Sequence, residues 1–224
     1  MKNALFLIVL VSFFSSCKEN ITNPGRIQSD TISIGSQVWM TKNLNVDHYR
    51  NGDPIPEVKD LKLWAKLTTG AWCYYNNDTS MGAIYGKLYN WYAVNDPRGL
   101  APEGWHIPSN SELSELETYL GGGIAGGKMK ESGTYHWGAP NCGATNESGF
   151  SALPGGHLYI YYEGEGSYKC ELFLNVGGLG NWWSSTEYGN TSAHFWYLSS
   201  NDVYIQWAYC SKVNGLSVRC IKDN

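Results

Sequence analysis

The chain has 224 residues, of which 42% are hydrophobic and only 16% are charged, and its formal net charge is −4. This balance excludes the broad basic surface that nucleic-acid binding requires. The chain contains 10 Trp, 16 Tyr and 26 Gly residues, a composition that favours an extracellular, loop-rich protein with a preference for β-structure.

Residues 1–16 are typical of an export signal. Lys2 precedes an apolar run that ends at Phe14 and is too short to anchor the chain stably in a bilayer. Two serines then lead into Cys17, which resembles a bacterial lipobox in which Phe14 replaces the usual leucine. We therefore expect cleavage before Cys17, acylation of that cysteine and a lipidated tether over residues 17–29. An ordinary signal peptide with a chance cysteine is the alternative.

The two residues after Cys17 are Lys18 and Glu19. They resemble the surface-export signal of Bacteroidetes lipoproteins, so we expect a lipid-anchored protein on the outer membrane, at the cell surface. No composition break follows, and residues 30–224 are predicted to form a single domain.

The domain is predicted to begin with a β-hairpin. In "TISIGSQVWM" the apolar residues alternate on both sides of a Gly35-Ser36 turn. An irregular loop with Gly52 and two prolines follows.

The clearest predicted helix lies in "PSNSELSELETYLGGG". Ser109 and Glu112 have the spacing of a capping box. Leu113, Leu116 and Leu120 follow at helical intervals and would form one apolar stripe. Further helices are predicted around 62–67 and 88–93.

The C-terminal half reads as strands and turns. "GHLYIYYEGEG" alternates Leu158 and Ile160 with Tyr159 and Tyr161, and "SAHFWYLSSNDVYIQWAYCSKVNGLSVRCI" contains three strand-like runs. The expected fold class is α+β, with one to three helices on a twisted, mostly antiparallel sheet and long loops.

The glycine-rich segment "GGGIAGGKMK" at 121–130 partly matches nucleotide-binding loops. Such loops need a preceding strand and a following helix, whereas these glycines follow a helix. Met129 also replaces the Ser or Thr that would hold magnesium. We interpret the segment as a helix C-cap with a flexible loop.

Other candidates for chemistry are sparse. Ser184 and Ser185 lie near Glu187 and His194, but no G-x-S-x-G motif occurs, and a catalytic triad cannot be read from proximity in sequence. "SSND" at 199–202 offers oxygen ligands for calcium, and a turn before a strand explains it equally well. No pair of histidines has metal-ligand spacing, so no metal site and no cofactor are predicted.

Five cysteines remain besides Cys17, and an exported chain favours disulfides. The odd number leaves at least one thiol free. The sequence leaves the pairing of these residues open: Cys73, Cys142, Cys170, Cys210 and Cys220.

The surplus of Trp and Tyr suggests glycan binding. A sugar stacks its C–H face on an aromatic ring, and Asn, Asp and Tyr side chains bond its hydroxyl groups. The alternative is that most of these rings fill the core. In "NWWSSTEYGN", one tryptophan should be buried and its neighbour should face a loop or groove, because adjacent strand residues point to opposite sides. The candidate ligand-binding residues are Trp182, Trp183, Tyr188, Trp196, Tyr204 and Trp207.

Several ordered blocks resemble a known family. They are "GSQVWMTKNLNV", "NGDPIPEV", "LTTGAWCYYNND", "YGKLYNWYAVND", "APEGWHIPSNSEL", "GGKMKESGTYHW", "GATNESGFSALPGG", "NWWSSTEY" and "GLSVRCIKD". Over residues 30–223 the chain resembles the Fibrobacter succinogenes major paralogous domain, a module of exported proteins.

The resemblance implies a C-type-lectin-like domain with no established catalytic residues. Cys170 and Cys210 look like additions to the family pattern, so we expect them to form a disulfide. The calcium-binding triplets of true C-type lectins are absent. The expected function is a non-catalytic binding or adhesion module for a glycan or a cell-surface protein. The alternatives are an extracellular hydrolase, a formylglycine-type oxidase or a structural surface component.

Overall fold

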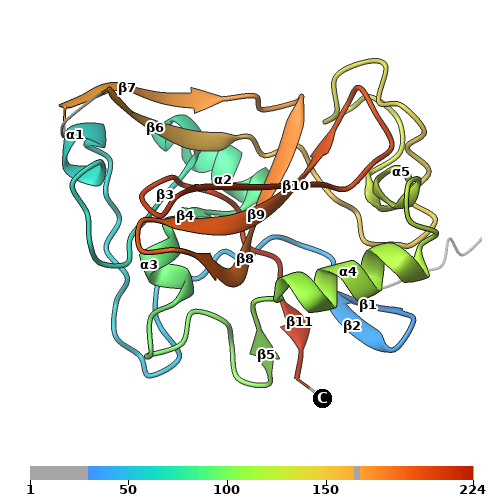
Figure 1. Ribbon diagram of the computed structural model, residues 1–224, viewed down its shortest axis with the longest axis horizontal. Coiled ribbons are helices and arrows are strands. Elements are labelled where there is room, and N and C mark those ends of the chain that lie inside the picture. The colour runs from blue at the N-terminus through green and yellow to red at the C-terminus, as the bar shows by residue number, and fades with distance from the viewer. Residues whose placement is uncertain (1–29, 164–166, 224) are drawn as a thin grey trace, which may run out of the picture.

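The computed structural model describes residues 30–163 and 167–223 (Figure 1). The strands are β1 (Thr31–Ile34), β2 (Gln37–Met40), β3 (Trp72–Cys73), β4 (Leu88–Tyr89), β5 (Trp105–His106), β6 (His157–Glu163), β7 (Ser167–Leu174), β8 (Leu179–Tyr188), β9 (Ser192–Ser199), β10 (Gln206–Ser211) and β11 (Ile221–Lys222). The helices are α1 (Leu61–Trp64), α2 (Thr79–Tyr85), α3 (Trp91–Val94), α4 (Asn110–Tyr119) and α5 (Ala125–Met129), with a 3₁₀ turn, η1, at Tyr75–Asn77.

The named strands pair antiparallel, which confirms the predicted α+β class. One sheet has the order β1-β2-β11-β5, a second has the order β10-β9-β8, and β3-β4 and β6-β7 form separate pairs. In Figure 1 the β6–β7 hairpin lies above the β8–β10 sheet, and α4 runs in front of and below it. Among the described residues, no helix is long and apolar enough to cross a membrane.

The elements predicted from local patterns are confirmed. The β1–β2 hairpin turns at Gly35, whose φ is +61°. Helix α4 begins with the predicted capping box of Ser109 and Glu112. Its stripe of Leu113 and Leu116 is buried, as expected for an amphipathic helix.

The short helices depart more from prediction. α1 and α3 are one-turn helices within or beside the predicted ranges, and α2 was not predicted. The glycine-rich segment is not simply a loop, because it contains α5. Its glycines permit close packing: a Cβ on Gly126 would lie 2.3 Å from the carbonyl oxygen of Tyr204, and one on Gly127 would lie 2.5 Å from that of Gly143.

The β8–β10 sheet is covered on both faces. Trp182 and Trp196 point to a cluster that includes the leucines of α4, and their rings stack with centroids 4.4 Å apart. Trp183 points the other way, into a cluster that contains Trp72 and Trp91. A third core cluster contains Leu158 and Ile160, the buried residues of β6. The aromatic surplus therefore largely fills the core, which was the alternative interpretation of the composition.

His106 joins three segments near the C-terminus of the described chain. Its Nε2 lies 2.6 Å from Glu112 Oε1 at the start of α4, and its Nδ1 lies 2.7 Å from Asp223 Oδ1 after β11. Burial lowers the pKa of His106, but the two carboxylates outweigh burial and raise it above the ordinary value of 6.5. The imidazolium therefore stabilises the folded state.

We expect this contribution to depend on pH. A raised pKa means that the stabilisation is fully present below the unfolded-state pKa and is lost as the pH rises through the folded-state pKa. The side chain is partly exposed, so the effect should be at most about 1 kcal/mol. Urea unfolding of wild type and His106→Asn from pH 5.5 to 9 should show a difference that shrinks with rising pH. Asp223→Asn should reduce this pH dependence, and a difference that is flat across the range would contradict the assignment.

Candidate functional site

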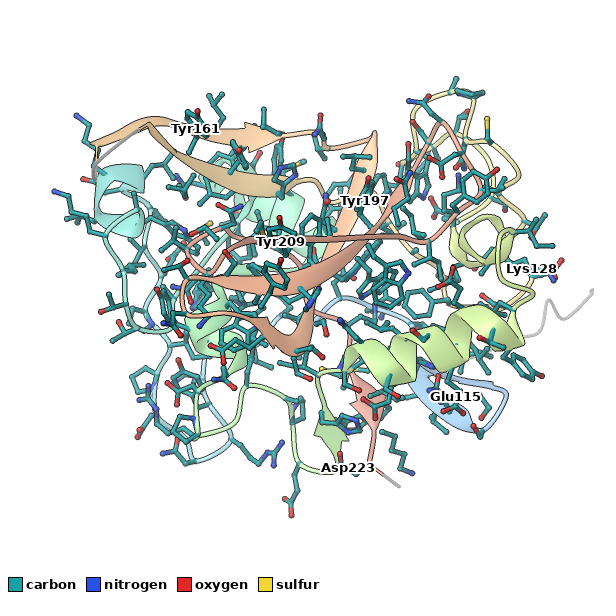
Figure 2. The ribbon with its side chains drawn as sticks, viewed as in Figure 1. Glu115, Lys128, Tyr161, Tyr197, Tyr209 and Asp223 are labelled. Atoms are coloured by element: carbon teal, nitrogen blue, oxygen red, sulfur yellow. The ribbon has the colours of Figure 1, made fainter. Side chains whose placement is uncertain are left out.

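A pocket of about 320 Å³ lies between β6 and the β8–β10 sheet. Strand β6 contributes His157 and Tyr159, while Asn181 of β8 and Phe195 and Tyr197 of β9 also line it. Residues 208–210 of β10 complete the lining on the far side. Figure 2 shows Tyr197 and Tyr209 on the sheet below the hairpin that carries Tyr161. Pockets that bind small molecules commonly begin at about this volume.

One wall of the pocket, the aromatic wall, is formed by His157 and Tyr159 and results from the alternation of side chains along β6. Leu158 and Ile160 are buried in the core, so His157 and Tyr159, which alternate with them, point to the opposite side, toward the pocket. The strand is fixed in place by two backbone bonds between Leu158 and Gly215, of 2.8 and 2.9 Å. The amide of Ile160 donates to Asn214 Oδ1 at 3.0 Å, which adds a third attachment.

The pocket is mostly apolar and carries no formal charge. Its lining includes no Asp, Glu, Lys or Arg among the described residues. Burial lowers the pKa of His157 to about 4, so its ring is neutral at pH 7. Asn181 Nδ2 lies 3.4 Å from His157 Nδ1, and an amide that donates there places the ring proton on Nε2.

Several polar atoms in the pocket remain available to a ligand. Within the described part of the chain, no bond to His157 Nε2 or Asn181 Oδ1 is formed. Tyr197 donates its hydroxyl proton to Gln206 Oε1 at 2.7 Å, which leaves its oxygen free to accept. The pocket thus offers a donor, two acceptors and aromatic rings, a set suited to a neutral molecule with hydroxyl groups.

Cys210 also lines the pocket and carries a free thiol. Burial raises its pKa to about 12, so the thiol stays protonated at neutral pH and is a poor nucleophile. Cys73 and Cys220 are free and buried in separate core clusters. Because Cys210 is free, the structure does not form the expected disulfide between Cys210 and Cys170, a residue whose side chain lies outside the described residues.

Three of the predicted ligand-binding residues are not at the surface. Trp182, Trp183 and Trp196 are fully buried, so the expectation that they contact a ligand is wrong. Trp182 and Trp183 do face opposite sides of β8, but each side is covered by a core cluster. Their indole nitrogens donate to Asn43 Oδ1 and to the carbonyl oxygen of Tyr89, both at 2.8 Å.

The other three predicted residues are exposed, but they lie outside the pocket: Tyr188, Tyr204 and Trp207. Tyr188 stacks on Tyr209 with ring centroids 4.0 Å apart. Tyr209, which was not predicted, pairs across the strands with His194, on the same face as Trp196. Tyr188 and Tyr209 form an exposed aromatic patch on the face opposite Phe195 and Tyr197, and Tyr209 also borders the pocket at the edge of the sheet.

The pocket residues His157, Tyr159, Phe195 and Tyr197 were also missed as a site. The one signal in the sequence was the alternation of "GHLYIYYEGEG", which predicts an outward tyrosine face but not what lies opposite it.

The serine-rich stretch has a structural role. Ser184 is buried, and its Oγ accepts from the amide of Thr186 at 3.1 Å. Thr186 Oγ1 accepts from the amide of Asn110 at 3.0 Å, at the start of α4. Glu187 forms an ion pair with Lys212. The structure therefore does not bring Ser184 and Glu187 together with His194 as a triad. Instead, the hydroxyls of Ser184 and Thr186 satisfy backbone amides where the register of β8 shifts.

The ammonium group of Lys130 binds the backbone carbonyl oxygens around "SSND". Lys130 Nζ donates to the carbonyl oxygens of Cys142, Ser199 and Asp202 at 2.9, 2.7 and 2.8 Å. The carbonyls of this turn thus satisfy an internal ammonium group. Among the described residues, no cluster of three or more His, Cys, Asp or Glu side chains has the arrangement of a metal site.

Comparison with known proteins gives one family. No curated protein and no solved structure matches the chain significantly. The family model described as the Fibrobacter succinogenes major domain matches residues 32–222. This match spans most of the sequence and both walls of the pocket. The chain therefore belongs to the Fibrobacter succinogenes major domain family.

Proposed function

We propose that the protein is a non-catalytic binding module of the cell surface and that its ligand is a neutral glycan held in the β6–sheet pocket. The observation that carries this proposal is the lining itself. Tyr159, Phe195 and Tyr197 supply rings, while Asn181 and neutral His157 supply polar atoms, with no charged group beside them.

The chemistry of a sugar fits this lining. Its C–H groups pack on an aromatic face, and its hydroxyl groups both donate and accept hydrogen bonds. A sugar acid would have to bury its carboxylate in a pocket without a cationic partner, and such burial is costly. The pocket therefore favours neutral sugars over uronic or sialic acids.

The proposal also includes the location and the finer fold. The export signal, Cys17 and the tether lie outside the described residues, and an outer-membrane lipid anchor remains our proposal from the sequence. We likewise propose a C-type-lectin-like arrangement. Its support is the resemblance of the segment that begins α4 and of the final "GLSVRC" segment to such folds.

A glycan array tests the function. The full chain in detergent should bind neutral glycans and not their sialylated or uronic-acid counterparts. Tyr159→Ala should lower the affinity about tenfold, because it removes a ring from the wall. Tyr135→Ala is the matched control, because that tyrosine is 90% exposed and outside the pocket.

Other outcomes would redirect the proposal. An array with no hits would contradict glycan binding. Capture of a purified surface protein that Tyr188→Ala abolishes and Tyr159→Ala spares would instead assign adhesion to the exposed aromatic patch, because Tyr188 belongs to that patch and lies outside the pocket. Release of shortened glycans during incubation would instead assign a hydrolase.

A further inference from the structure

We propose that the pocket is the first of two adjacent subsites, and that the ligand is a glycan chain whose second sugar unit packs against Tyr161. This inference rests on the proposed function and specifies the ligand as an oligosaccharide rather than a single sugar.

Tyr161 continues the aromatic wall beyond the pocket. It follows His157 and Tyr159 at intervals of two along β6, so all three side chains lie on the same face. The rings of Tyr159 and Tyr161 are stacked, with centroids 6.3 Å apart and planes 19° apart. The register of the hairpin is regular through Tyr161 and shifts only after it, so the alternation holds to this residue.

The two positions differ in their exposure to solvent. Tyr159 is partly buried and lines the pocket, whereas Tyr161 is 44% exposed and lies outside it. A sugar in the pocket would thus be largely enclosed, and a neighbouring unit along β6 would have one aromatic side and one solvated side. Figure 2 shows Tyr161 on the hairpin, above the sheet that carries Tyr197.

The wall is organised before any ligand binds. Leu158 and Ile160 anchor the strand in the core, and backbone pairing with β7 extends through Tyr161. Holding the rings in place in the free protein reduces the entropy lost on binding. A single exposed tyrosine needs no explanation by itself. What points to a subsite here is the continuity of Tyr161 with the pocket through Tyr159.

Chain-length dependence tests the inference. The probes are glucose, mannose, galactose and N-acetylglucosamine, each alone and as linear oligomers of two to four units, measured by ligand-observed NMR and calorimetry on the full chain. For the sugar that binds, the dimer should bind about three- to tenfold more tightly than the monomer, the range expected for one ring contact. A third and a fourth unit should add little.

Matched variants separate the two subsites. Tyr161→Ala should remove the gain from the second unit and leave monomer affinity unchanged, and Tyr161→Phe should retain most of the gain. Tyr159→Ala should weaken both ligands, and Tyr135→Ala should weaken neither. Equal affinity of wild type for monomer and dimer, or an equal loss of both in Tyr161→Ala, would overturn the second subsite and leave the pocket in place. Unchanged binding in Tyr159→Ala, or no binding by wild type, would overturn the proposed function with it.

Discussion

Replacing Trp183 with alanine should lower the free energy of unfolding by about 3–5 kcal/mol. The side chain is fully buried between the β8–β10 sheet and the core cluster of Trp72 and Trp91. Its removal leaves a cavity, and it also takes the indole partner from the carbonyl oxygen of Tyr89. Denaturant unfolding followed by circular dichroism measures the change. Trp183→Phe should cost less, because it keeps most of the buried ring volume, although it still loses the hydrogen bond.

Trp207 provides the matched control on a strand of the same sheet. It is 36% exposed, and its Nε1 donates to Glu117 Oε2 at 3.0 Å. Trp207→Ala should therefore lower the free energy of unfolding by only about 0.5–1 kcal/mol. Equal losses for the two variants would show that the burial of Trp183 does not decide its contribution.

The tryptophan pair shows what period-two alternation can and cannot predict. Trp182 and Trp183 point to opposite faces of β8, as expected. The inference that one of them faces solvent or a groove assumed a sheet with one covered face. Here both faces are covered, by α4 and its cluster on one side and by the cluster around α3 on the other. That second layer comes from segments far away in the sequence, so the alternation of β8 carries no trace of it.

Local signals predicted the elements that local interactions stabilise. The Ser109–Glu112 capping box and the leucine stripe are complete within a dozen residues, and α4 forms there. The one-turn and two-turn helices are too short for a periodic pattern to develop, and they depend on tertiary packing. This is why α2 was missed and α5 was interpreted as a loop.

The candidate site is harder to predict because it lies between strand β6 and a sheet, β8–β10, to which β6 does not belong. The outward face of β6 was visible in the alternation of Tyr159 and Tyr161 with buried residues. Its position opposite Phe195 and Tyr197 follows from the contact of Leu158 with Gly215, more than fifty residues later. A sequence pattern can identify each wall, but the pocket depends on long-range contacts such as this one and the bond from the amide of Gly156 to the carbonyl oxygen of Leu179.

Arg219, in the "GLSVRC" segment, is the second residue for which we expect a large effect. Its guanidinium is fully buried, and burial lowers its pKa to about 9. Among the described residues it forms no ion pair with a carboxylate. It donates instead to Asn43 Oδ1 and to the carbonyl oxygens of Met40 and Phe150, at 2.7 to 3.2 Å.

Arg219→Met should lower the free energy of unfolding by about 2–4 kcal/mol. The substitution keeps an unbranched chain but leaves buried acceptors without donors, and the relief of a buried charge offsets only part of that cost. Asn43 Oδ1 keeps one donor, Trp182 Nε1, so the carbonyl oxygen of Phe150 should bear most of the loss. Denaturant midpoints with unchanged slopes would report this change as one of stability.

Arg98→Met is the informative comparison, because Arg98 forms ion pairs with carboxylates, whereas the described hydrogen-bond partners of Arg219 are all uncharged oxygen atoms. Arg98 pairs with the carboxylates of Asp53 and Asp96, at 3.2 and 2.9 Å, yet its side chain is 39% exposed. Solvent screening makes such exposed ion pairs weak. If burial and satisfied acceptors determine the contribution, Arg219→Met should destabilise the protein far more than Arg98→Met. If the Coulomb attraction of ion pairs determines it, the order should reverse, and Arg219→Met should be neutral or even stabilising.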